Sequence, residues 1–300
     1  MLDRRRLMVV VDVDDEQHLA LDRVQRLESI DEFTLRLVSC DYSRQLHGGI
    51  HFGGLGIPDL RVQYLSARER ALDALAAPLL DQGIRVETAA LWGHPPYHEI
   101  IHEVHRWEPD MLIHSARRHS RISRLFLTNE DWQLVRTCPC PLLLIKDKPW
   151  THEPGLIAAV DPMHDHDKPA GLDHKIIRAA EDFARILDGQ VHVLHACGTW
   201  LLPGIYREKA GTNHEQSMDA LLEDFDVPDD RVHVVDSPVE EAIPSLAQDL
   251  DADLVVMGAI SRTLLSETII GNTAERVLDY LRSDVLIIKP DEYVSPVSPD

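Results

Sequence analysis

The sequence has 300 residues, about twice the length of a typical domain of ~150 residues. Its 44% hydrophobic and 27% charged residues are ordinary for a globular protein. The formal net charge of −21 disfavours nucleic acid and anionic membrane surfaces as partners, because both repel an acidic chain. Four cysteines do not make a disulfide framework and are typical of a reducing cytoplasm, where we expect the protein to act.

The chain opens with a segment that imitates a secretory signal. Arg4, Arg5 and Arg6 precede an apolar run of five residues, Leu7–Val11, which ends at Asp12. A signal peptide needs an apolar core of about 7–15 residues, and a spanning helix needs about 18. We therefore expect neither a signal peptide nor a membrane span.

The two halves of the sequence repeat one pattern. LMVVVDVD at 7–14 resembles LIAAVDPM at 156–163, and each apolar run ends at an aspartate. Near the end of each half the match needs no gap, at an offset of 143: 109–121 lies over 252–264. We infer a duplicated domain. The expected segments are a first domain at 1–146, a linker at 147–155, a second domain at 156–290 and a disordered acidic tail at 291–300.

The second half predicts alternating strands and helices. In chain order they are a strand at 156–160, a helix at 171–187, a strand at 191–196, a helix at 212–225, a strand at 232–235, a helix at 238–250, a strand at 254–257, a helix at 272–281 and a strand at 285–288. This alternation predicts an α/β fold in which helices cover both faces of a parallel sheet. The first half has the same order, with extra loop around 47–56. We expect two tandem doubly wound, Rossmann-like domains.

The carboxyl ends of such strands form the edge where ligands bind. Asp161 ends the first strand of the second half, and Gly258 ends its fourth. Gly271 follows thirteen residues later, directly before Asn272 and Thr273 at a predicted helix start. Glycines and a helix N-terminus suit a phosphate, but a tight turn with a helix cap explains the same residues. Both interpretations stay open on the residues alone.

This segment resembles the signature of the universal stress protein family: Gly, any two residues, Gly, any nine, Gly, then Ser or Thr. Gly258 and Gly271 match the first and third glycines, whereas Ser261 replaces the second and Asn272 stands where Ser or Thr is expected. The resemblance implies an α/β fold that holds ATP on this loop. The two departures predict weak binding of ATP.

The resemblance also implies ligand contacts outside the loop. Asp161, Ala196 and Met257 match positions that contact adenine and ribose in the family. The duplication, together with residues 130–150 and 271–293, resembles the tandem E-type branch. That branch implies a monomer whose two domains pair internally through their last strands, with homodimers optional.

The first half does not keep the glycines. At the offset of 143, Ser115, Arg118 and Thr128 replace Gly258, Ser261 and Gly271. A β-carbon at these turns obstructs a phosphate, although the nearby arginines could receive an anion instead of being simply solvated. We therefore expect at most one nucleotide, in the second domain.

A second pattern is the HEIIH sequence at 98–102. Two histidines at this spacing, with a glutamate between them, are the zinc site of many peptidases. However, Ile100, Ile101 and Val104 predict that the helix packs through its apolar face, leaving His98 and His102 towards solvent. We expect no metal here.

The sequence leaves two functions open. One is a stress-response regulator that binds an adenine nucleotide or another small ligand. The other is a scaffold or carrier that acts through unidentified protein partners or an apolar ligand. A slow ATPase and a zinc enzyme at HEIIH are weaker alternatives, because no general base or pair of metal-binding carboxylates stands out. We therefore expect binding rather than catalysis.

Overall fold

A computed structural model describes residues 5–27, 29–43, 57–116, 127–163, 171–199, 204–258 and 272–299. The chain divides into two compact units. Unit 1 consists of Met1–Ser115, Asn129–Leu142 and Ser295–Asp300, and unit 2 of Ala116–Thr128 and Leu143–Val294. The expected loop at 47–56 and the arginine-rich segment at 117–126 lie outside the described residues.

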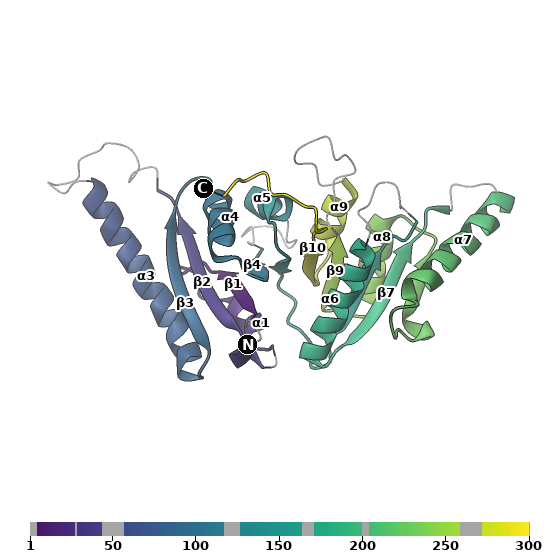
Figure 1. Ribbon diagram of the computed structural model, residues 1–300, viewed down its shortest axis with the longest axis horizontal. Coiled ribbons are helices and arrows are strands. Elements are labelled where there is room, and N and C mark those ends of the chain that lie inside the picture. Colours follow the sequence, from purple (N-terminus) through teal and green to yellow (C-terminus); the bar gives the residue numbers. More distant parts are fainter. Residues whose placement is uncertain are drawn as a thin grey trace. The chain divides into compact units, whose positions relative to one another are not determined.

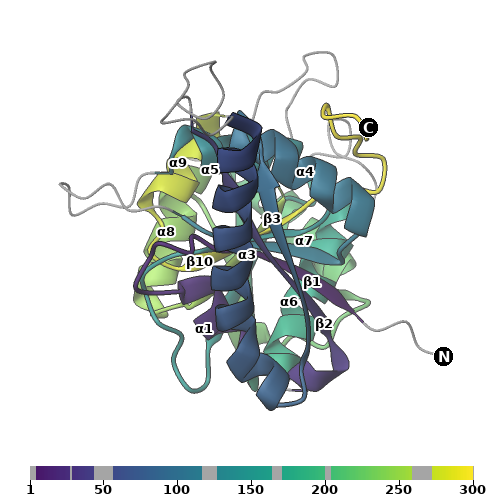
Figure 2. The same cartoon turned by 90° about the vertical axis from the view of Figure 1, so that its left-hand side faces the viewer.

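Unit 1 is a parallel sheet with strand order β3-β2-β1-β4 and helices packed against it (Figure 1). The long helix α3 lies along β3 and β2 (Figure 2). The elements are β1 (Arg6–Val10), α1 (Leu19–Val24), the 3-10 helix η1 (Ile30–Glu32), β2 (Thr34–Asp41), α3 (Ile57–Asp81), β3 (Arg85–Trp92), α4 (Pro96–Trp107), β4 (Met111–Ser115) and α5 (Asn129–Thr137).

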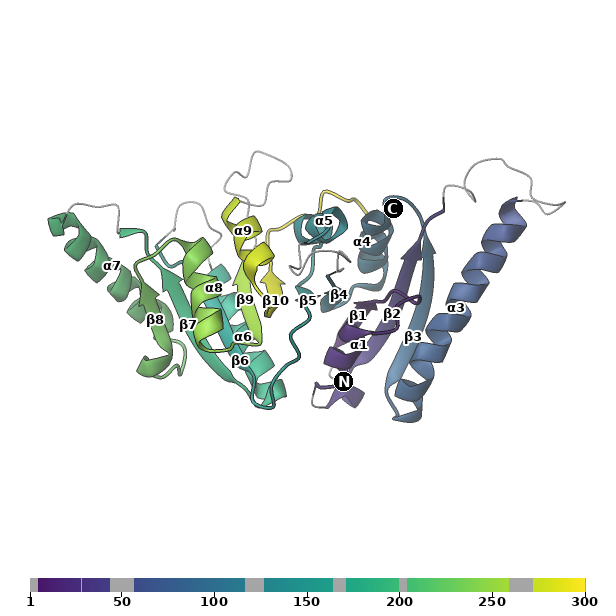
Figure 3. The same ribbon diagram turned by 180° about the vertical axis from the view of Figure 1, so that it is seen from behind.

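Unit 2 repeats this arrangement with strand order β5-β10-β9-β6-β7-β8. Helices α8 and α9 lie side by side (Figure 3). The elements are β5 (Leu142–Ile145), β6 (Gly155–Val160), α6 (Leu172–Leu187), β7 (Gln190–Ala196), α7 (Gly204–Leu222), the 3-10 helix η3 (Asp229–Arg231), β8 (Val232–Val235), α8 (Val239–Asp249), β9 (Leu254–Gly258), α9 (Asn272–Tyr280) and β10 (Asp284–Ile288). The expected α/β fold with tandem parallel sheets is confirmed.

The central strands are apolar runs because both of their faces are covered. All residues of β5 and β10 are buried, as are the first four of β9. Helix α6 shows the complementary pattern, with its apolar residues on one buried face. These are Leu172, Ile176, Ile177, Ala180, Phe183, Ala184 and Leu187. Burial of this face, rather than helix propensity, stabilises such an element.

Strand β5 ends the first repeat, yet from Leu143 on it belongs to unit 2 as the neighbour of β10. The next residue, Lys146, is completely buried. Its ammonium donates to the carbonyls of Leu278 and Leu281 at the C-terminal end of α9, and its backbone N–H donates to Asp284 Oδ1 at 2.6 Å. A cation at a helix C-terminus satisfies carbonyls that have no partner within the helix.

Residues Ser295 and Val297, which lie in the tail expected to be disordered, make hydrogen bonds within unit 1. The Ser295 hydroxyl donates to the Thr137 carbonyl at 2.6 Å, and His105 Nε2 lies 2.9 Å from the Val297 carbonyl. Both Ser295 and Val297 are buried. Acidic composition predicted solvation, but burial of the Val297 side chain and these hydrogen bonds hold residues 295–297 in unit 1.

Candidate functional site

The predicted ligand edge of unit 2 brings four of the expected residues together. Strand β6 lies between β7 and β9, and all three are parallel. Asp161 directly follows β6, Ala196 ends β7, and Met257 and Gly258 end β9. Because parallel strands end at the same edge, these residues line one rim of the sheet. The side chain of Asp161 is 41% exposed there.

Most of the predicted loop, residues 259–271, lies outside the described residues. Ser261 and Gly271 lie outside the described residues. Asn272 and Thr273 begin α9, as expected, but their side chains are also outside the described part. The N-terminus of a helix of this length presents free N–H groups.

Gly258 has a reason to be glycine that does not involve a ligand. A β-carbon built on it would lie 2.9 Å from Leu172 Cδ2 and 3.5 Å from Ile176 Cδ1, both on α6. The glycine therefore lets α6 pack closely over β9. In unit 1 the corresponding helix α1 has 6 residues against 16 in α6, and Ser115 stands at this position. Helix packing thus accounts for one glycine of the signature.

A histidine pair lies beside Asp161, and the sequence patterns gave no sign of it. His195 on β7 is 1% exposed, and its Nε2 lies 2.7 Å from Nδ1 of His214 on α7. Its Nδ1 lies 3.3 Å from the Val160 carbonyl and 3.9 Å from Asp161 Oδ1. Burial lowers the pKa of His195. His195 is therefore neutral at neutral pH where it borders the rim.

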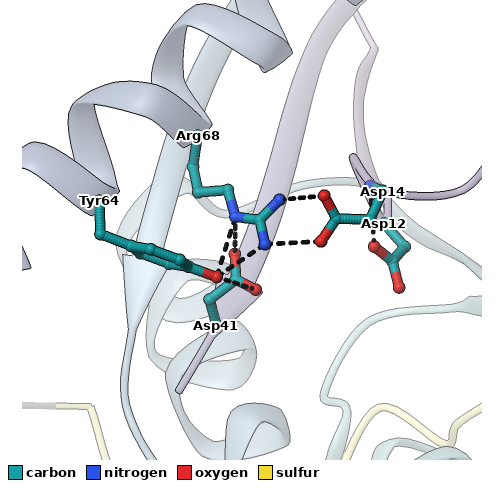
Figure 4. Close-up of polar contacts among 5 residues, drawn as sticks. All are labelled: Asp12, Asp14, Asp41, Tyr64 and Arg68. Carbon is teal, nitrogen blue, oxygen red and sulfur yellow. Dashed lines mark hydrogen bonds and ion pairs between the residues drawn. The ribbon is translucent and has the colours of Figure 1, made fainter. Parts of the chain in front are cut away.

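The equivalent edge of unit 1 carries an ion-pair cluster instead (Figure 4). Arg68 on α3 donates two hydrogen bonds of 2.6 Å to the carboxylate of Asp14, and its Nε lies 3.3 Å from Asp41 Oδ2. The Arg68 guanidinium also donates to the Tyr64 hydroxyl, which donates to Asp41 Oδ1 at 3.2 Å. Asp12 accepts the backbone N–H of Asp14 at 3.1 Å. This network ties α3 to the ends of β1 and β2.

The two carboxylates on Arg68 have opposite pKa shifts. The hydrogen bond from Arg68 lowers the pKa of Asp14, which is exposed. Burial raises the pKa of Asp41 and outweighs the attraction of Arg68. Burial likewise raises the pKa of Tyr64. The edge of unit 1 therefore holds its arginine mainly through Asp14.

The position of Met257 is also changed in unit 1. Its counterpart at the offset of 143 is His114 on β4. His114 is buried, and its Nε2 lies 2.8 Å from Oδ1 of Asp131 in the first turn of α5. A buried, hydrogen-bonded histidine is fixed in orientation. Unit 1 thus keeps the aspartate at the rim, Asp12, but has His114 and Ser115 where unit 2 has Met257 and Gly258.

The HEIIH sequence forms most of the middle of α4. Ile100, Ile101 and Val104 are buried, as the apolar pattern predicted. His98 and His102 are half-buried, and their ring centroids lie 4.8 Å apart. Within the described ranges no three His, Cys, Asp or Glu side chains are arranged to hold a metal ion.

Comparisons with known proteins agree with this fold and its duplication. The model of the universal stress protein family matches residues 3–146 and again 169–289. Universal stress protein E of Salmonella typhi is 32% identical over 252 residues, covering 80% of each chain. The universal stress protein E homolog of Haemophilus influenzae is 26% identical, covering 96% of this chain and 98% of its own.

A solved structure agrees over nearly the whole chain. A functionally unknown protein from Pseudomonas aeruginosa, PA1789, has a TM-score of 0.79 at 31% identity and covers 97% of this chain and 94% of its own. In the part of the chain that is described, no helix is both long and apolar enough to cross a membrane. The chain therefore belongs to the universal stress protein family, as a tandem member similar to universal stress protein E.

Proposed function

We propose that this protein is a cytoplasmic, ligand-binding stress-response regulator with a single adenine-nucleotide site at the edge of unit 2. The observation that carries the proposal is the convergence of Asp161, Ala196 and Met257 where β6, β7 and β9 end together. A carboxylate beside two apolar side chains suits a ribose hydroxyl and a base. The following helix, α9, supplies an N-terminus for phosphate.

Asymmetry between the units supports one site per chain. In unit 1, Arg68 and Tyr64 from α3 are bonded to Asp14 and Asp41. A nucleotide entering this edge would have to break charge-assisted hydrogen bonds, each worth about 1.5–3 kcal/mol. His114 also replaces the methionine of unit 2. We infer that unit 1 contributes no nucleotide site.

A second candidate function is a scaffold or carrier that acts through protein partners or an apolar ligand. The packing of Gly258 against Leu172 favours the scaffold or carrier, because close packing of α6 then explains this glycine without a phosphate. His195 at the same rim also offers no positive charge to a phosphate at neutral pH, because burial lowers its pKa.

Titration with a fluorescent ATP analogue separates the two candidates. Wild-type protein should bind one analogue per chain weakly, with Kd on the order of 0.1 mM. Asp161→Asn should weaken binding, whereas the matched change Asp12→Asn in unit 1 should not. Ser261→Gly combined with Asn272→Ser should tighten binding at least ~10-fold, by restoring the signature. Equal effects of the two aspartate changes, or two sites per chain, would contradict a single site. Absence of binding even in the restored variant would favour the scaffold.

A further inference from the structure

Two histidines on neighbouring strands of unit 2 form a cluster away from the ligand edge. His192 on β7 and His233 on β8 lie 41 residues apart in sequence, yet His192 Nδ1 is 3.1 Å from His233 Nε2. Their rings are stacked at an interplanar angle of 28° with centroids 5.3 Å apart. The strand register places Leu194 opposite His233, so the two histidines are diagonal neighbours on one face of the sheet.

The distance between the two nitrogens is that of a hydrogen bond, and it also matches the separation of two ligands on one metal ion. Nitrogens at 2.0–2.1 Å from one ion, with angles between 90° and the tetrahedral value, lie about 2.9–3.4 Å apart. The 3.1 Å between His192 and His233 is within this range. The 2.7 Å between His195 and His214 is shorter than the range and is a simple hydrogen bond.

The protonation and exposure of the pair also suit a metal ion. A neutral imidazole carries a lone pair on one ring nitrogen, and this is the form that binds a metal ion. Asp230 adds negative charge beside both rings, while Arg231 acts in the opposite direction on His192. Both histidines are half-buried, and β8 is the last strand in the order. An ion can therefore reach the pair and keep water in its remaining positions.

We propose that His192 and His233 form a binding site for a first-row divalent transition-metal ion of the Zn²⁺ type. Imidazole nitrogens favour zinc, copper and nickel over magnesium or calcium. In the empty pair one ring donates its N–H to the other. When the ion binds, that hydrogen moves to the other nitrogen of the same ring, so both facing nitrogens coordinate and no proton is lost.

The ion would join β8 to β7. All four residues of β8 are only half-buried, so the strand has little apolar burial to hold it. An ion that binds the folded protein but not the unfolded chain raises stability by mass action. Metal binding at this pair should therefore stabilise the pairing of β8 with β7, independently of any nucleotide site.

The test is calorimetric titration of zinc chloride into the full chain without an affinity tag, in a buffer that does not chelate, at about pH 7.5 where the rings are neutral. We expect one Zn²⁺ per chain at this site. His192→Gln and His233→Gln should each weaken it at least ~10-fold, because one remaining imidazole is a poor site. The matched control is His98→Gln with His102→Gln on α4, which should leave this binding unchanged.

Three results would overturn the proposal: no saturable binding to the wild type, binding retained in both single variants, or binding lost with the α4 pair. If either single variant fails to fold, the wild type still decides. Addition of Zn²⁺ should shift the imidazole NMR signals of His192 and His233 before those of the other histidines. A shift that begins at other histidines would count against the site.

Discussion

The sheets of the two units carry different polar side chains at one equivalent, half-buried position. The strand registers, counted from Asp12 and Asp161, put Arg36 on β2 and His192 on β7 at the same place. Arg36 lies 2.6 Å from Glu103, which is completely buried on α4, and 2.5 Å from Glu87 on β3. At the offset of 143, Glu103 corresponds to Leu246 on α8.

The difference suggests that the charge of the helix that covers the sheet is matched by the charge of the strand side chain. Where α4 supplies a carboxylate, the sheet carries a permanent cation, and Trp107 lies with its ring centroid 5.7 Å from the Arg36 guanidinium. In unit 2 the position that corresponds to Glu103 is a leucine, and the strand position that corresponds to Arg36 is His192, whose pKa burial lowers. Glu103 is completely buried, and a buried charge without a partner is costly, so we expect the two positions to be energetically coupled.

The largest expected effect comes from breaking the ion pair of unit 1. Glu103→Gln should lower the free energy of unfolding by about 3–5 kcal/mol, because Arg36 loses its buried partner. Urea denaturation followed by tryptophan fluorescence measures the loss. Arg106→Gln is the matched control, because Arg106 also pairs with Glu103 but is 65% exposed. It should cost less than ~1 kcal/mol.

The same comparison predicts a rescue. Combining Arg36→His with Glu103→Leu copies the arrangement of unit 2 into unit 1. The pair should recover most of the stability that Glu103→Gln loses, because neither change then leaves an unpaired buried charge. A double variant as unstable as the sum of its single variants would show that the two positions are not coupled.

A smaller effect should follow from removing the arginine of the unit 1 edge. Arg68→Met leaves Asp14 and Asp41 without their shared partner, and we expect a loss of about 1.5–3 kcal/mol. The pKa of Asp41 should also rise further, since burial would act without the attraction of Arg68. NMR titration of the carboxyl signals checks this. Arg68→Lys keeps the charge but loses the paired hydrogen bonds, so its free energy of unfolding should lie between those of Arg68→Met and the wild type.

The smallest expected effect is a different response of the two units to acid. The pKa values of His192, His195 and His233 are lowered in the folded chain, so the unfolded chain takes up protons first as pH falls below about 6.5. Unit 2 should therefore lose stability in mild acid. The lowered pKa of Asp14 in unit 1 has an effect only below about pH 4.

Hydrogen exchange with a metal chelator present, corrected for the intrinsic rate at each pH, measures this difference. Between about pH 7.5 and 5.5, peptides from β7 and β8 should lose more protection than peptides from β1 and β2. Equal losses in both units would mean that the buried histidines do not decide the response to acid.

Features that depend on local periodicity could be predicted from the sequence. The alternation of strands and helices, the duplication and the place of Asp161 and Gly258 at one edge all depend on patterns within single elements or on a fixed offset. The Arg68 cluster could not be predicted this way, because it joins α3 to residues after β1 and at the end of β2. No spacing rule relates such positions before the strand order is known.

Other features were missed for related reasons. The 41 residues between His192 and His233 hide a contact that arises only from the register of β7 with β8. Composition predicted a solvated tail, although Val297 is buried. The role of Gly258 in helix packing was also not visible, because a motif does not reveal what its missing side chain would contact.

The buried Lys146 determines where the chain can be cut to make a stable fragment of the second repeat. A fragment that starts at residue 147, where the second repeat begins by sequence, would carry α9 without the cation that caps it and β10 without its neighbour β5. Such a fragment would expose a strand edge that invites aggregation. We therefore expect that a stable fragment of the second repeat must include β5, the last strand of the first repeat.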